Sequence, residues 1–65
     1  MPKIFVEMLP GRSVEQKREM VSRITDVMVE TMNVGRDTVH IIIHENCREN
    51  VAQGGVLFCD RSKTK

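Results

Sequence analysis

The sequence predicts an α/β (α+β) fold, a single β-α-β unit with parallel strands followed by a short C-terminal hairpin or strand. Three observations predict it: an alternating apolar run at residues 3–9, a capped amphipathic segment at about 14–32, and an almost continuously apolar run at 38–45. A strand, a helix and a second strand at this spacing form a right-handed crossover. We expect one domain over residues 1–65.

The first strand is expected at residues 3–9, and Pro10-Gly11 ends it, because proline cannot donate to a strand ladder and glycine tolerates turn geometry. Its apolar residues are divided between both faces, with Ile4, Val6 and Met8 on one and Phe5 and Leu9 on the other. The strand is therefore expected to be partly covered on both sides.

The helix is expected to begin at a capping box formed by Ser13 and Gln16, with Glu15 favourably placed in its first turn. Asn33 and Gly35 are typical stop residues. The buried stripe is predicted at Met20, Val21, Ile24, Val27, Met28 and Thr31, and the charged residues predicted to point mainly away from it are Lys17, Arg18, Arg23 and Glu30.

The run Thr38–Glu45 is typical of a strand buried on both faces. A polar, turn-rich segment follows and ends in Gly54-Gly55, and Val56 to Cys59 is expected to form a final strand or hairpin arm. One helix cannot cover both faces of a two-stranded sheet, and such a sheet is not stable alone in water. We therefore expect obligate self-association.

Composition excludes several classes of function. The formal net charge is +1 and the aromatic residues are two phenylalanines, so neither a basic surface nor a base-stacking platform for nucleic acid is expected; the basic tail 61–65 is interpreted as a solvated end. No run approaches the roughly 18 apolar residues that span a membrane. Two cysteines and no signal-peptide pattern favour a soluble, cytoplasmic protein.

Pro2 directly follows the initiator methionine. Removal of Met1 would leave a secondary amine fixed at the start of a strand. An uncharged amine near neutral pH is a competent general base, and desolvation or a nearby cation favours that form. Many proteins begin with Met-Pro, so a catalytic role for Pro2 needs support from the rest of the sequence.

The sequence resembles the 4-oxalocrotonate tautomerase family over nearly all of residues 2–60. The resemblance is carried by Pro2, by the run Gly11-Arg12-Ser13-x-Glu15-Gln16-Lys17, by the strand TVHIIIHE, and by Asn50-x-x-x-Gly54-Gly55. It implies a cofactor-independent keto-enol tautomerase (an isomerase) in aromatic degradation, acting on a small unsaturated carboxylate such as 2-hydroxymuconate. It also implies a homohexamer, a trimer of dimers, with sites where chains meet; a hetero-oligomer is the alternative.

Carried over residue by residue, the resemblance makes Pro2 the catalytic base and Arg12 a ligand of the substrate carboxylate, with Leu9, His40 and Val51 also at the substrate. Two of these depart from the family pattern. His40 stands where the family has a second arginine, and histidine lacks the permanent charge and bidentate geometry of arginine. Val51 stands where the family has an aromatic wall, which puts the diacid substrate in doubt.

Several interpretations stay open. Either His40 is a hydrogen-bond donor to another substrate, or a partner chain supplies the arginine, or the chain is a poorly active relative; His40 as an ordinary strand histidine is equally open. A non-catalytic scaffold and a hydratase or dehalogenase of unsaturated acids are the alternative functions. Arg36, Arg48 and Arg61 are loop or tail cations, one of which could project into a neighbouring pocket. His40 and His44 are about 13 Å apart along a strand, too far to share a metal ion, and Cys47 lacks a fixed activating base.

Overall fold

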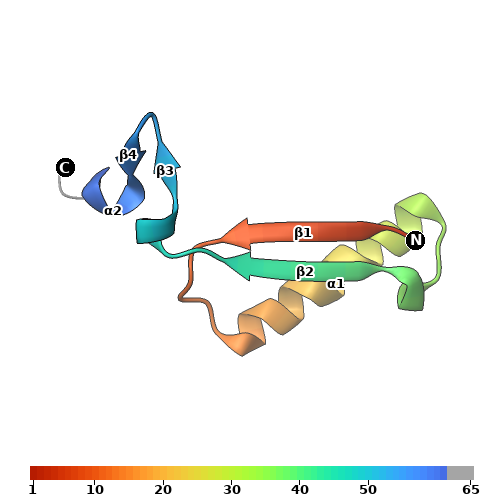
Figure 1. The fold of residues 1–65 in the computed structure, drawn as a ribbon. Coiled ribbons are helices and arrows are strands. Elements are labelled where there is room, and N and C mark those ends of the chain that lie inside the picture. The colour runs from red at the N-terminus through yellow and green to blue at the C-terminus, as the bar shows by residue number, and fades with distance from the viewer. Residues whose placement is uncertain (62–65) are drawn as a thin grey trace.

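Two parallel strands and one long helix form the main unit of the fold (Figure 1). The computed structural model describes residues 1–61. β1 spans Lys3–Met8, α1 spans Val14–Met32 and β2 spans His40–Glu45. β1 and β2 pair in parallel, with a register that runs from Lys3↔His40 to Met8↔Glu45. α1 makes the crossover and lies across one face of the sheet, so the predicted β-α-β unit is confirmed.

The ends of α1 are fixed by the residues that the sequence indicates. The Gln16 amide donates to Ser13 Oγ at 3.1 Å, and the Ser13 amide donates to Gln16 Oε1 at 3.0 Å. At the other end Asn33 adopts a left-handed conformation, with φ 58°, and donates its amide to the Val29 carbonyl at 3.1 Å. These bonds satisfy backbone groups that a helix leaves unpaired at its termini. The predicted helix 14–32 is therefore confirmed.

The packed side of the unit differs in part from the predicted stripe. Side chains that are half-buried between the sheet and α1 are Ile4, Val6, Met8, Lys17, Met20, Val21, Ile24, Thr25, Met28, Val29, Ile41 and Ile43. Val27, at 55% exposure, and Thr31 lie outside this layer. The two strands are about 5 Å apart, so the sheet is narrower than the apolar face of α1. Side chains at one edge of that face therefore lie beyond the sheet and stay exposed. Lys17 was predicted to point away and is instead half-buried.

The other face of the sheet is open. Phe5 and Ile42 are partners in the strand register and are 57% and 37% exposed. Within the described chain no side chain is fully buried. Inside one chain α1 covers one face and the C-terminal elements lie beyond the strand ends (Figure 1). The cover expected on the second face of β2 therefore has to come from another chain, as the sequence predicts.

The segment after β2 folds as a small hairpin beyond the carboxyl end of the sheet (Figure 1). A 3-10 helix, Arg48–Asn50, precedes strands β3 (Ala52–Gln53) and β4 (Val56–Leu57), which pair antiparallel. Gly54 and Gly55 both have positive φ, 62° and 83°, as a two-residue hairpin turn requires. The predicted final strand stops at Leu57, because Phe58–Arg61 form the short helix α2.

Two other element boundaries were predicted wrongly. The first strand ends at Met8 rather than at residue 9. The second strand begins at His40, because Arg36–Thr38 form a 3-10 helix in which Thr38 Oγ1 donates to the Gly35 carbonyl at 2.7 Å. Among residues 1–61, no helix combines the length and apolar character needed to cross a bilayer. Of the basic tail, residues 62–65 lie outside the described residues.

Candidate active site

Pro2 and His40 lie together at the amino end of the sheet. The His40 amide donates to the Pro2 carbonyl at 3.1 Å, which extends the parallel ladder by one residue and fixes the backbone of Pro2 beside β2. Pro2 is half-buried, and the His40 side chain is exposed. In the full chain the Pro2 nitrogen is part of the peptide bond to Met1. It becomes an amine only in a chain that has lost Met1.

Arg12 lies near the opposite end of the sheet, in the connection between β1 and α1. Its side chain is exposed. Residues from Met8 to Arg12 line one hollow, to which Leu9 and Pro10 contribute apolar surface. Gly11 has a φ of 124°, which side chains other than glycine rarely adopt, so this residue lets the chain turn out of β1 just before Arg12.

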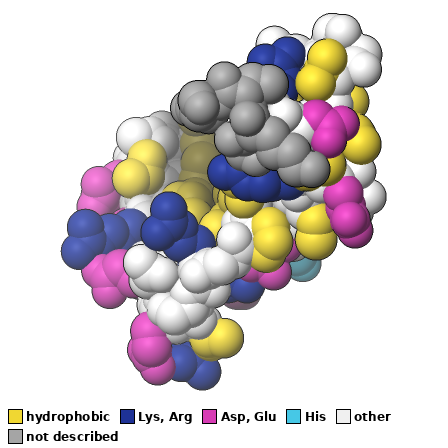
Figure 2. Space-filling model, turned by 90° about the vertical axis from the view of Figure 1, so that its left-hand side faces the viewer, with side chains coloured by type: hydrophobic (Ala, Val, Ile, Leu, Met, Phe, Trp, Pro, Cys, Tyr) yellow, Lys and Arg dark blue, Asp and Glu magenta, His cyan; other side chains and the backbone are white. Residues whose placement is uncertain are grey.

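Leu9 and Val51 meet in a second, largely apolar hollow with a volume of about 200 Å³. Its other lining residues are Glu7, Met8, Asn46 and Phe58. Figure 2 looks onto this end of the molecule and shows hydrophobic side chains lining a recess, with Lys and Arg side chains nearby. Met8 and Leu9 line both this hollow and the one at Arg12, so a cation and an apolar wall are neighbours here.

Phe58 is an aromatic residue of this hollow that the sequence did not indicate as part of the site. Its amide donates to the Val51 carbonyl at 2.8 Å, which brings α2 against the position where the resemblance predicts an aromatic wall. Phe58 is one of only two aromatic residues in the sequence, and this rarity was the available indication. The hairpin turn that folds Phe58 back onto Val51 could not be placed from the pattern alone.

The predicted site residues therefore form two groups at opposite ends of β1. Pro2 and His40 lie at the amino end, whereas Leu9, Arg12 and Val51 lie at the carboxyl end. A strand of six residues is about 20 Å long at roughly 3.3 Å per residue, and Figure 1 shows the N-terminus and the start of α1 at opposite ends of the sheet. One chain does not bring Pro2 to its own Arg12.

The three arginines that could project into a neighbouring pocket differ in their surroundings. Arg36 is paired with Asp26, and Arg61 lies over the Phe58 ring at 5.8 Å and donates to the Gln53 carbonyl at 3.0 Å. Arg48 lines a hollow beside Leu9, Pro10, Cys47, Glu49 and Cys59. Of the three arginines, Arg48 therefore shares a hollow with Leu9, a predicted site residue.

The histidines on β2 form no cluster. His44 Nδ1 is 3.8 Å from Glu7 Oε2, and its ring meets Phe5 edge to face with centroids 6.0 Å apart. His40 lies four residues earlier, next to Pro2. Within residues 1–61 there is no group of three or more His, Cys, Asp or Glu side chains that could hold a metal ion.

The family model, the relatives and the solved structures that this chain resembles are tautomerases or probable tautomerases. A family model described as tautomerase enzyme matches residues 2–61. A probable tautomerase of Staphylococcus epidermidis is 34% identical over 61 residues, which are 94% of this chain and 100% of the relative. A structure among the 4-oxalocrotonate tautomerase isozymes from Methylibium petroleiphilum is 38% identical, with a TM-score of 0.88 over 98% of this chain and 100% of that one. A heterohexamer 4-oxalocrotonate tautomerase from Chloroflexus aurantiacus J-10-fl is 28% identical, with a TM-score of 0.80 over 92% and 97%.

Proposed function

Because the chain belongs to the tautomerase family, we propose that it is a cofactor-independent isomerase that interconverts the enol and keto forms of a small unsaturated 2-oxo acid. The observation that carries the proposal is the position of Pro2. It is half-buried at the head of β1 and held there by the His40 amide. An amine at this position would be fixed in direction and partly shielded from water, which favours its uncharged form.

The proposed reaction moves one proton. With Met1 removed, the Pro2 nitrogen takes a proton from the enol hydroxyl or from the carbon next to the conjugated carbonyl, and the same proton is returned further along the conjugated system. Negative charge develops on the oxygen and is spread over the conjugated system. Arg12 binds the carboxylate through paired N–H donors, which anchors and orients the substrate. The Leu9 and Val51 side chains hold the carbon skeleton in their apolar hollow.

We propose that the complete site forms between copies of the chain. The separation of Pro2 from Arg12 along β1 supports this, and so does the open face that carries Phe5 and Ile42. A homohexamer built as a trimer of dimers would place the amino end of one sheet against the carboxyl end of another. A mixed assembly is the second candidate, because His40 is not an arginine and the Chloroflexus relative is a heterohexamer.

The test begins with the intact mass of the purified protein, which shows whether Met1 has been removed. Ketonisation of phenylenolpyruvate and of 2-hydroxymuconate is then followed for wild type, for Pro2→Ala, and for a chain that retains Met1. We expect both altered chains to lose at least about tenfold in kcat/KM, because general-base catalysis contributes about 10²–10⁴-fold. Equal inertness of the processed wild type and Pro2→Ala would instead identify a non-catalytic subunit.

A further inference from the structure

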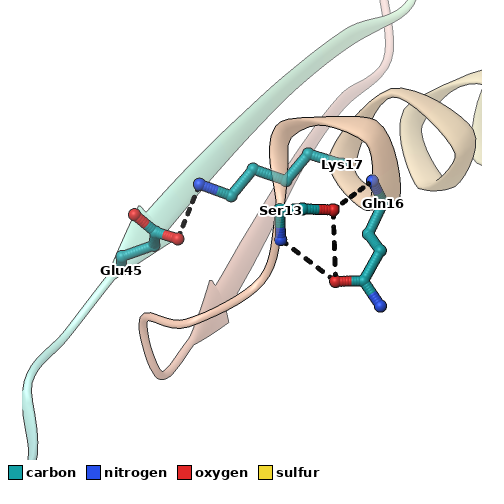
Figure 3. A network of polar contacts seen from close by, with 4 residues as sticks. All are labelled: Ser13, Gln16, Lys17 and Glu45. Atoms are coloured by element: carbon teal, nitrogen blue, oxygen red, sulfur yellow. Dashed lines mark hydrogen bonds and ion pairs between the residues drawn. The ribbon is translucent and has the colours of Figure 1, made fainter.

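The short connection that carries Arg12 is anchored on both sides. On the β1 side, the Asn46 amide donates to the Met8 carbonyl at 2.9 Å and so continues the pairing of the strands past their ends. On the helix side, the capping box of Ser13 and Gln16 fixes the first turn of α1 (Figure 3). In the same turn Lys17 Nζ reaches across to Glu45 Oε2, at 2.6 Å, on the last residue of β2.

The Lys17–Glu45 pair differs from the other ion pairs of α1. Its side chains are 26% and 33% exposed, and it joins two elements that are distant in the sequence. Arg23 and Glu19 also approach to 2.6 Å, but they are 78% and 64% exposed and lie one turn apart on the same helix. Exposed pairs within a helix contribute little, whereas a partly shielded pair is less screened by water.

We propose that Lys17 and Glu45 are positioning residues for Arg12: their ion pair holds the start of α1 against the end of β2 and thereby sets where the Arg12 guanidinium meets the substrate carboxylate. Three residues, Pro10 to Arg12, separate Leu9 from the helix cap. The turn at Gly11 has no other anchor among the described contacts. Recognition of a carboxylate by a guanidinium depends on orientation, so a shift of the helix start weakens it. This inference rests on the proposed function.

The test uses Lys17→Met, Glu45→Gln and the double variant, with KM and kcat measured on phenylenolpyruvate. A positioning role predicts that all three raise KM by about threefold to tenfold while kcat changes little, because Arg12 would then bind substrate and transition state less well to the same extent. A purely electrostatic role predicts opposite signs: Glu45→Gln would lower KM, Lys17→Met would raise it, and the double variant would restore it. That second pattern would overturn the proposal.

Two controls separate this role from general destabilisation. Glu19→Gln removes the matched pair with Arg23, at the same 2.6 Å distance, and should leave KM unchanged. In an Arg12→Ala background, Glu45→Gln should add no further rise in KM, because its effect acts through Arg12. Hydrogen exchange of the amides from Gly11 to Gln16 should become faster in Glu45→Gln, a readout that does not need activity.

The outcomes also distinguish this inference from the proposed function. If Arg12→Ala itself leaves KM unchanged, the assigned role of Arg12 is wrong. If Arg12→Ala raises KM but neither Lys17→Met nor Glu45→Gln does, only the positioning role of Lys17 and Glu45 is wrong. The same holds if Glu45→Gln raises KM equally in the presence and absence of the Arg12 side chain.

Discussion

Replacing Phe5 by alanine tests whether copies of the chain cover the open face of the sheet. Phe5 is 57% exposed in one chain and lies opposite Ile42 in the register. A phenylalanine buries roughly 200 Å² when fully enclosed, so covering the exposed part removes about 110 Å² from water, or about 3 kcal/mol at roughly 25 cal/mol per Å². Alanine keeps part of that contact. We therefore expect Phe5→Ala to weaken assembly by about 2 kcal/mol per chain, roughly thirtyfold in an association constant.

Sedimentation velocity over a dilution series measures this effect directly. Val27→Ala is the matched control, since Val27 is 55% exposed but lies on the overhanging edge of α1, and it should leave the distribution of species near that of wild type. Circular dichroism at high protein concentration should show that Phe5→Ala keeps its helix and strands. If Phe5→Ala and Val27→Ala dissociate at the same concentration as wild type, another surface holds the copies together and the reasoning from the open face is wrong.

Two further predictions concern the helix cap and the residue in the arginine position. Ser13→Ala removes the hydroxyl that accepts the Gln16 amide, and should lower the free energy of unfolding by about 1 kcal/mol; urea unfolding at one fixed protein concentration measures it, with the exposed, mid-helix Ser22→Ala as control, and an equal effect of both would refute the cap argument. His40→Arg should raise kcat/KM on 2-hydroxymuconate more than on phenylenolpyruvate, because a permanent cation beside Pro2 favours a second carboxylate; an unchanged ratio of the two substrates would count against the placement of His40 at the site.

The local elements were predictable because their signals are local. The capping box of Ser13 and Gln16, the stop at Asn33 and the two glycines of the hairpin each act through bonds or conformations within a few residues. The limits of α1 therefore agree with the sequence. The β-branched run Ile41–Ile43 likewise favours a strand.

The wrong predictions depend on the width of the sheet and on residues that the fold brings close together. A sequence pattern contains neither. Val27 follows the helical spacing but overhangs a sheet of only two strands. Lys17 has the spacing of a surface residue on α1, but the fold places Glu45 of β2 beside it. Phe58 is the third residue of an apolar run, yet a new helix starts there and Phe58 lines the same hollow as Val51. In the proposed shared site Pro2 and Arg12 come from different chains, a relation that neither the sequence nor one chain displays.

Complementation between two impaired variants, compared by kcat/KM, tests the central claim most directly. Pro2→Ala and Arg12→Ala chains are prepared separately, unfolded together and refolded as mixed assemblies, with each variant refolded alone as control. A site that takes Pro2 from one chain and Arg12 from another predicts a return of activity to about a quarter of the wild-type value, since random pairing leaves about one site in four intact. Activity no higher than the average of the two variants refolded alone would contradict a site shared between chains.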